Sequence, residues 1–439
     1  MRRRSVVAPA LFLSFVLLPS SGLSESNRPK RAGEFICGTS AERKRDALAR
    51  GLYHESLLRQ RGVDRRAARA LATTERAISA TDVGDVAVLE DDGTLLLEPR
   101  SFDLAGMSFR FEPAGVSSYG VVASTAVFGG QSGANVALGD DDTSSQDLGF
   151  TFPFFGKSYT AVQLNSDGNL TFEQSDTAQT ERDLGRFDSG PPRIGPLFAD
   201  LDPPAGGSVS IRKDVDAVLF AWTNVRNFGS TRSNSFSVKL FRSGTIEFAY
   251  GTSVNTAEAV VGISPGAAVS HVSAVEFASA LPTGSLEGSI VDVFSATATI
   301  SETEIGRRFF ENHPDRFDQV TLFLGFDFDL DGNAYAYEIA VKNDVQGIGL
   351  GQGDDGAVFG SHGALRGFLN MGSLDGTDRY PADPAQVYLG TNSTLSLMGH
   401  EFGHQWLAYA AFRDGSASSR AILGRDNAHW SFFSTPAHL

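Results

Sequence analysis

The stretch His400-Glu401-Phe402-Gly403-His404 lies close to the end of the 439-residue chain and carries two histidines four positions apart. Residues four apart share one face of an α-helix, so the two imidazoles can hold one metal ion between them. Glu401 lies within one side-chain reach of that ion and can act as a general base. The pattern therefore predicts a helix that carries a zinc site.

The residues around this motif predict a long, buried helix. Thr391 to Thr394 offer several N-cap side chains, and no proline interrupts the run from there to Phe412. Apolar residues cover almost every side of this run, which is typical of a helix buried all round. Two histidines and a glutamate buried there need compensation, and a bound metal ion provides it. The alternative is a chance match that contains ordinary core histidines.

This motif is typical of the active-site helix of a zinc metallopeptidase. Such a site needs a third protein ligand, and the sequence leaves several candidates open. The extension typical of metzincins requires Gly at position 407 and His at 410, where this chain has Leu407 and Ala410. A gluzincin would use a downstream glutamate, and none follows Glu401. The remaining downstream candidates are Asp414, Asp426, His429 and His438.

We favour His429 as the third ligand, because aromatic neighbours within residues 424–433 would exclude water and hold its imidazole. Asp426 or Asp414 would instead give an aspzincin-like His-His-Asp site. In that case His429 would have the role of stabilising the oxyanion of a tetrahedral intermediate.

Composition and the N-terminus indicate an exported protein. The formal net charge of −15 gives no reason to expect binding to nucleic acid or to an anionic membrane. Arg2 to Arg4 form a basic region, Val6 to Leu18 an apolar one, and residues 20–24 are mostly small, which together predict a signal peptide over residues 1–24. The apolar run is too short for a comfortable membrane span. We therefore expect a secreted protein, extracellular or periplasmic, without a membrane span in the mature chain.

Residues 25–112 are predicted to form a helical and short-strand N-terminal region or propeptide. Helices are expected over residues 41–60 and 64–78, and short strands over 86–89 and 95–97. Cys37 is the only cysteine, so an intramolecular disulfide is excluded. Three roles stay open for Cys37: a small buried hydrophobe, an intermolecular bridge, or a metal ligand that holds a propeptide in a latent enzyme.

Residues 113–298 consist of short alternating segments separated by turn residues, which predicts an all-β, sandwich-like domain. The segments that carry a family resemblance, in this order, are residues 150–159, 164–172, 192–202, 219–223 and 235–248. Their order resembles the nidogen-like extracellular domain. This resemblance implies a β-rich module used for adhesion or positioning, with an extracellular matrix or surface ligand as its partner.

Two groups of acidic residues raise the question of calcium. Asp200 and Asp202 could bind Ca²⁺, although such a pair more often caps a turn. The run from Asp327 to Glu338 fits the spacing of an EF-hand loop, but its flanks look like strands rather than helices. A strand-turn-strand hairpin is therefore the better prediction for this run, and calcium is only a weak expectation.

Residues 299–439 are predicted to form an α+β domain. A helix over 304–312 is followed by strands over 319–326, 334–341 and 364–371, and the histidine helix comes last. This motif and order resemble the zincin metallopeptidases. The resemblance implies that a peptide substrate adds a strand to a sheet edge, for which we select residues 367–372. Because few residues follow His429, we expect this domain to be truncated at its C-terminus.

The sequence as a whole predicts a multidomain, secreted zinc endopeptidase in which His400, His404 and His429 hold Zn²⁺. Glu401 would act as the general base on a metal-activated water that attacks the peptide bond. The alternative function is a non-catalytic extracellular adhesion or binding protein with a degenerate zincin domain.

Overall fold

The computed structural model describes the backbone of residues 13–16 and, in full, residues 36–62, 84–130, 133–267, 271–279, 281–330, 334–374, 380–407, 409, 411–424 and 428–429. The predicted helix over 64–78, Asp426, His438 and most of the predicted signal peptide lie outside these residues. The chain divides into two compact units. Unit 1 contains Met1–Ala47, Arg65–Leu96 and Ser301–Leu439, and unit 2 contains Leu48–Asp64 and Leu97–Ile300.

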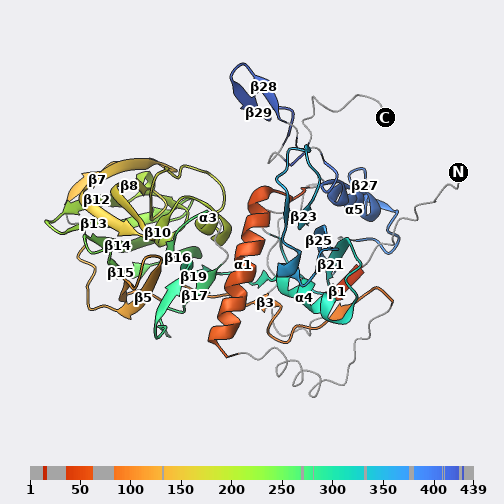
Figure 1. Cartoon of the computed structure of the whole chain (residues 1–439), viewed down its shortest axis with the longest axis horizontal. Helices are drawn as coiled ribbons and strands as arrows, with labels where there is room; N and C mark the ends of the chain where they lie inside the picture. Colours follow the sequence, from red (N-terminus) through yellow and green to blue (C-terminus); the bar gives the residue numbers. More distant parts are fainter. Residues whose placement is uncertain are drawn as a thin grey trace. The chain divides into compact units, whose positions relative to one another are not determined.

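Unit 2 is built from two large, mainly antiparallel sheets (Figure 1). The first has the order β17 (Val272–Ala274), β19 (Ser289–Ser295), β16 (Glu258–Ser264), β10 (Arg193–Phe198), β9 (Asn169–Thr171), β8 (Lys157–Asn165) and β7 (Thr143–Phe154). The second has the order β18 (Ser285–Glu287), β5 (Ser118–Ala123), β4 (Ser108–Pro113), β15 (Ile246–Val254), β14 (Ser233–Phe241), β13 (Ala217–Asn227), β12 (Ser208–Lys213) and β6 (Ala134–Val136), and β11 (Leu201–Asp202) pairs with β13.

One hydrophobic core joins the two sheets of unit 2. Strand β7 illustrates how the sequence builds this core. Its buried residues alternate with exposed ones, as in any strand with one face toward a core; they are Leu148, Phe150, Phe152 and Phe154. They pack in one cluster with buried side chains of the other sheet, among them Trp222. The predicted β-sandwich-like arrangement of the nidogen-like region is therefore what the structure shows.

Two helices contribute residues to unit 2, the first of them only from Leu48 onward. Helix α1 (Ala41–Gln60) has the predicted bounds, and its residues Tyr53 and Leu57 pack in a second cluster with side chains of β10 and β19. Helix α3 (Leu184–Ser189) begins at Asp183, whose side chain accepts a hydrogen bond from the Arg186 N–H.

Unit 1 contains a five-stranded mixed sheet of the order β2 (Val88–Leu89), β1 (Leu13–Val16), β21 (Gln319–Leu324), β25 (Gly367–Ser373) and β22 (Tyr337–Ala340). The neighbours β1, β21 and β25 pair in parallel, whereas β22 pairs antiparallel with β25 and lies at the edge. Strand β1 lies within the predicted signal peptide. The strands predicted over 319–326 and 334–341 are present in shortened form, and the one predicted over 364–371 is shifted and ends at Ser373.

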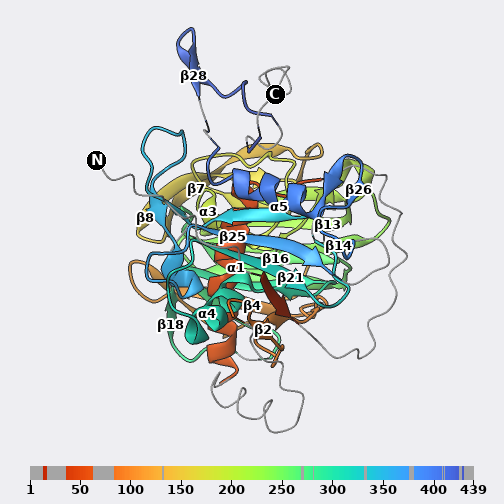
Figure 2. The same ribbon diagram turned by 90° about the vertical axis from the view of Figure 1, so that its right-hand side faces the viewer.

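Helices cover both faces of this sheet (Figure 2). Leu369 packs with Leu397 and Met398 of α5 (Thr394–Gly403) on one face. Phe368, the residue before Leu369 on β25, points to the other face. There its ring lies 5.6 Å from Phe359 of η3 (Gly356–Phe359), against which α4 (Glu302–Asn312) packs.

Short elements complete the described chain. They are β3 (Leu96–Leu97), η1 (Pro203–Ala205), β20 (Thr299–Ile300), β23 (Lys342–Asn343), β24 (Gly353–Asp354), β26 (Val387–Leu389), β27 (Asn392–Ser393), β28 (Phe412–Asp414) and β29 (Ala417–Ser419).

The strand selected from the sequence as the substrate edge was wrong. Residues 367–372 form β25, which lies between β21 and β22 and pairs with both. An interior strand has its backbone groups engaged on both sides, so it cannot accept an added strand. The antiparallel strand β22 is the edge of this sheet.

Candidate metal centre

Helix α5 presents the two motif histidines, and its start is fixed by a capping box. The Ser393 side chain accepts a hydrogen bond from the Ser396 N–H at 3.2 Å, and the Ser396 hydroxyl accepts one from the Ser393 N–H at 2.8 Å. This N-terminus agrees with the sequence-based expectation.

The end of α5 differs from the prediction of a helix that continues to Phe412. The helix ends at Gly403, and its last turn tightens, since the N–H groups of His404, Gln405 and Trp406 bond to carbonyls three residues back. Trp406 is 72% exposed, and Phe412 belongs to the hairpin strand β28. The pattern of polar and apolar residues could not reveal this end, because the residues after Gln405 are apolar through Phe412.

The expectation that α5 is buried on all sides was also wrong. Its buried side chains form a single face, made of Thr394, Leu397, Met398 and Glu401, and the C-cap residue His404 is buried as well. Leu395 is 51% exposed, and His400 lies at the solvent side of the site. The helix is therefore amphipathic, with one histidine of the pair buried and the other exposed.

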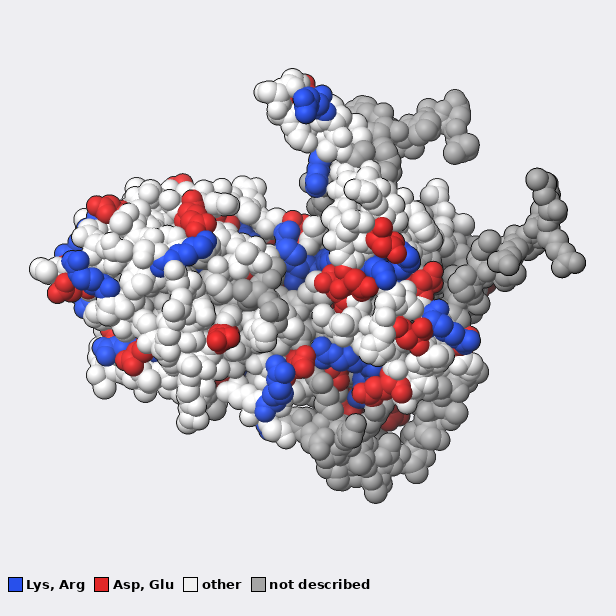
Figure 3. Space-filling view, viewed as in Figure 1, with Lys and Arg blue, Asp and Glu red and all other residues white. Residues whose placement is uncertain are grey.

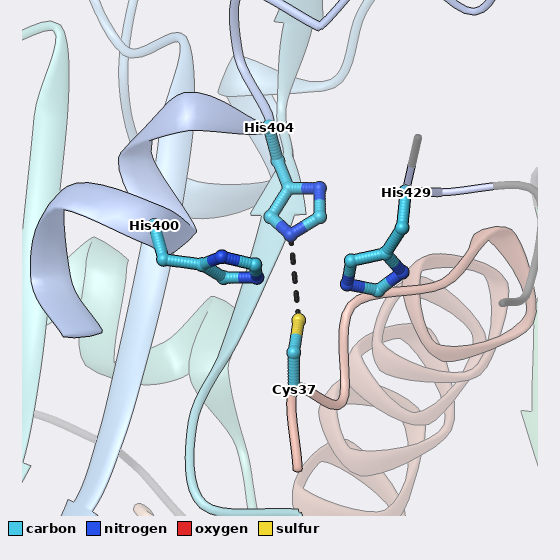
Figure 4. Close-up of side chains that lie close together, drawn as sticks. All are labelled: Cys37, His400, His404 and His429. Carbon is cyan, nitrogen blue, oxygen red and sulfur yellow. Dashed lines mark hydrogen bonds between the residues drawn. The ribbon is translucent and has the colours of Figure 1, made fainter. Parts of the chain in front are cut away.

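Three histidines and one cysteine converge on a single point (Figure 4). One ligand atom from each of His400, His404, His429 and Cys37 lies within 4.8 Å of those of the other three. The ring centroid of His429 is 5.5 Å from that of His400 and 4.9 Å from that of His404. The structure thus places His429 beside the motif pair. Asp414 is exposed on β28 and is not part of this group.

Cys37 reaches the site from the segment that precedes α1. Its Sγ atom lies 3.3 Å from His404 Nε2 and donates to Glu401 Oε2 at 3.4 Å. Burial, followed by the neighbouring Glu401 carboxylate, raises the pKa of the Cys37 thiol. A bound cation would act in the opposite direction and favour the thiolate.

Two further polar residues, Thr39 and Glu338, surround Glu401, and neither was predicted to belong to the site. The Thr39 hydroxyl donates to Glu401 Oε2 at 2.7 Å and accepts a hydrogen bond from the Glu338 N–H at 2.7 Å. Glu338 lies on β22 and is 2% exposed. Burial, followed by the charge of Glu401, raises the pKa of Glu338 to about 8. The sequence drew attention to Glu338 only as the last position of the EF-hand-like run, which is not the role that the structure indicates.

The donor set fits zinc by its chemistry. Zinc prefers imidazole nitrogen and thiolate sulfur in a tetrahedral arrangement of four ligands. Three imidazoles and one thiol around one point supply such a set, and the spacing of their ligand atoms is close to what one ion requires. Carboxylate-rich sites, which magnesium and calcium prefer, have a different composition.

The two groups of acidic residues considered for calcium have other partners. Asp202 accepts a hydrogen bond from the Ala205 N–H and caps the short helix η1, while Asp200 pairs with Arg182 at 3.0 Å. The EF-hand-like run begins after strand β21 and ends at Glu338 on strand β22, so strands rather than helices flank it, as predicted. The predicted hairpin was wrong, because β21 and β22 do not pair with each other and β25 lies between them in the sheet. Asp331 lies outside the described residues.

Surface charge and helix length add two observations. On the face drawn in Figure 3, acidic and basic side chains are intermixed, and no broad patch of one sign is visible among the coloured residues. Among the helices that the structure describes, none has the length and apolar character needed to cross a bilayer.

Comparison with known proteins identifies part of the chain. Residues 118–304 match the family described as NIDO related. The comparison with curated proteins and the comparison with solved structures each gave no match. The chain therefore contains a NIDO-related β domain, which covers most of unit 2 and points to an extracellular protein.

Proposed function

We propose that this chain is a secreted zinc-dependent endopeptidase that carries a NIDO-related domain for positioning at an extracellular ligand. The observation that carries the proposal is the convergence of His400, His404 and His429 on one point, with the carboxylate of Glu401 next to it. Further support comes from the arrangement of unit 1. An HExxH helix packs on a mixed sheet whose edge strand, β22, runs antiparallel to its neighbour.

Each group of residues would have its own role in the reaction. His400, His404 and His429 would hold the zinc, which supplies Lewis acidity to the attacking water and to the scissile carbonyl. Glu401 Oε2 would take a proton from the water and then deliver it to the leaving amine. The backbone of β22 would hold the peptide as an added strand, which fixes the position of the scissile bond relative to Glu401.

Zinc content tests the ligand set. We expect about one zinc per full-length chain by elemental analysis, because a three-imidazole site is complete for zinc. In the Cys37→Ala background, which removes the fourth candidate ligand, His429→Ala should lose most of that zinc, whereas Asp414→Ala, at an exposed position on the β28–β29 hairpin, should keep it. Zinc retained by His429→Ala would move the third ligand elsewhere.

Hydrolysis tests the role of Glu401. Because the Cys37 thiol lies at the same point, turnover of a quenched fluorescent casein is measured in the Cys37→Ala background. Adding Glu401→Gln should keep the zinc but lower turnover by about 100-fold to 10,000-fold, the range for loss of a general base. Equal turnover with and without Glu401 would refute the mechanism.

One observation favours a second candidate function. With Cys37 included, the group offers four ligands, and closed four-ligand sites are typical of structural zinc. The chain would then be a non-catalytic extracellular binding protein whose NIDO-related domain is the functional part. In that case no variant of Cys37 or Glu401 would hydrolyse casein.

A further inference from the structure

The segment Ile36–Thr39 lies along the edge of the sheet in unit 1. The Tyr335 N–H donates to the Ile36 carbonyl at 2.8 Å, and the Gly38 N–H donates to the Ala336 carbonyl at 2.8 Å. Cys37 thereby pairs in parallel with Ala336, immediately before β22. This segment therefore uses backbone groups that an added peptide strand would use.

The side chains of the same segment contact the polar atoms of the candidate centre. Cys37 Sγ is in contact with both His404 and Glu401, and Thr39 donates to the same carboxylate oxygen, Oε2. Figure 4 shows the cysteine pointing from its segment to the point where the three imidazoles meet. The segment thus covers both the metal position and the group that would accept the proton.

The first turn of α1 anchors this segment. Arg43 Nε donates to the Gly38 carbonyl at 2.8 Å, and its guanidinium lies 4.4 Å from the centre of the Tyr337 ring. Lys44 pairs with Asp355 at 2.9 Å. A Cβ atom on Gly38 would lie 2.6 Å from the Ala334 Cβ, so a larger residue cannot keep this approach. The close fit argues for a built contact rather than a chance crossing of two segments.

We infer that Ile36–Thr39 is an intramolecular inhibitory segment, with the Cys37 thiolate as the fourth zinc ligand and the backbone of the segment in the position of a peptide substrate. The inference rests on the proposed function, because it assigns the regulation of the same site. Catalytic zinc keeps one coordination position open, and Cys37 fills that position. Since the segment is part of the chain, its local concentration at the site is far above that of any substrate. The chain as it stands is therefore latent.

The metal environment provides a test that is independent of turnover. X-ray absorption of the zinc-loaded, full-length chain should show one sulfur scatterer at about 2.3 Å, the zinc–thiolate distance. In Cys37→Ala that scatterer should disappear while about one zinc per chain remains. Ile36→Ala serves as the matched control, because its exposed side chain belongs to the same segment, and it should leave the sulfur scatterer in place.

Turnover of quenched fluorescent casein tests the inhibitory role. Cys37→Ala should raise turnover at least about 100-fold, the factor for a segment released in about 1% of molecules. Gly38→Val, which leaves every proposed ligand intact, should also raise turnover, because the segment can no longer approach Ala334. Ile36→Ala should remain as inactive as the unmodified chain.

The outcomes separate the two proposals. Zinc without a sulfur scatterer in an active, unmodified chain would overturn the inhibitory segment and leave the peptidase intact. Loss of zinc from Cys37→Ala would show that the cysteine holds a structural metal, which overturns the inhibitory role. If Cys37→Ala keeps its zinc and loses the sulfur scatterer, but neither Cys37→Ala nor Gly38→Val hydrolyses casein, both the peptidase and its inhibitory segment are refuted.

Discussion

Asp188 illustrates at the residue scale how a buried carboxyl group ties the stability of unit 2 to pH. Its side chain is 3% exposed and accepts a hydrogen bond from the Ser289 hydroxyl at 2.5 Å. Burial raises the pKa of Asp188 to about 6. The unfolded chain releases this proton near pH 4, whereas the folded chain keeps it until about pH 6. Stability should therefore fall as the pH rises through this interval and stay lower above it.

Asp188→Asn should remove this pH dependence, because the amide cannot ionise and its oxygen can still accept from Ser289. We expect the variant to be more stable than the parent at pH 7.5 by at most about 3 kcal/mol and to be similar at pH 4. Urea unfolding at both pH values, followed by the fluorescence of the buried Trp222, measures the difference.

Asp216→Asn is the control for this prediction, because the Asp216 side chain is 75% exposed. Its effect should stay within about 0.5 kcal/mol at either pH. A gain in stability for Asp188→Asn that is equally large at pH 4 would show that ionisation of Asp188 is not its cause.

The residues of the candidate centre differ in how far the sequence revealed them. The spacing of His400 and His404 is a local property of one helix, so it could be read directly from the sequence. His429 was favoured among four downstream candidates because of its aromatic neighbours, and the structure places it beside the pair. Cys37 and Thr39 lie 364 and 362 positions before Glu401, and the pairing of their segment with the chain at and just before β22 brings them there. No local pattern carries that information.

At the element scale, the turn between β8 and β9 depends on Gly168. Its φ is +66°, and a Cβ atom there would lie 2.1 Å from the Leu197 carbonyl oxygen. The Leu197 N–H also donates to the Gly168 carbonyl, so the two backbones cannot separate without losing this bond. Gly168→Ala should destabilise unit 2 by about 2 to 4 kcal/mol, from the combined strain and clash. Thermal unfolding followed by Trp222 fluorescence checks this value.

A second glycine separates the two contributions. Gly229 has nearly the same φ, +62°, but a Cβ atom there would meet nothing within 4 Å. Gly229→Ala should therefore cost only the strain of the left-handed conformation, about 1 kcal/mol. If the two alanine variants lost the same stability, the close approach to Leu197 would not be the source of the larger cost.

Element existence was more predictable than element arrangement. Strand β7 follows an alternating pattern that any half-buried strand must show, and α1 has the expected bounds. Two features failed because they depend on residues distant in the sequence. The order of strands in the sheet of unit 1 is set by pairing between segments, so the edge strand could not be recognised. After α5 the chain turns and forms the exposed β28–β29 hairpin, and the mostly apolar run after His404 does not show this change.

At the scale of the whole molecule, all four residues of the candidate centre belong to unit 1, and the NIDO-related match covers most of unit 2. The order of β segments along residues 150–248 was enough to suggest the nidogen-like domain, because an ordered set of weak matches is more specific than any one of them. The metal site, in contrast, combines ligands from both ends of the chain. The sequence left a metal ligand among the open roles of Cys37, but a domain-by-domain interpretation could not place the cysteine beside His404.

This division predicts that metal removal acts on one unit only. Binding to the folded state alone stabilises it by about 4 kcal/mol when free zinc is 1,000 times its dissociation constant, so dialysis against a chelator should lower the unfolding temperature of unit 1. Unit 2 should be unaffected, and Trp222, buried and stacked 5.0 Å from Phe236, reports its unfolding. Scanning calorimetry of the full chain, with and without chelator, should show one transition that moves and one that coincides with the Trp222 signal and stays in place.

His404→Ala, as the control, should show no response to the chelator. A shift of the Trp222 signal that matches the calorimetric shift would mean that the two units unfold as one, and the assignment of the metal to unit 1 alone would then fail as an account of stability.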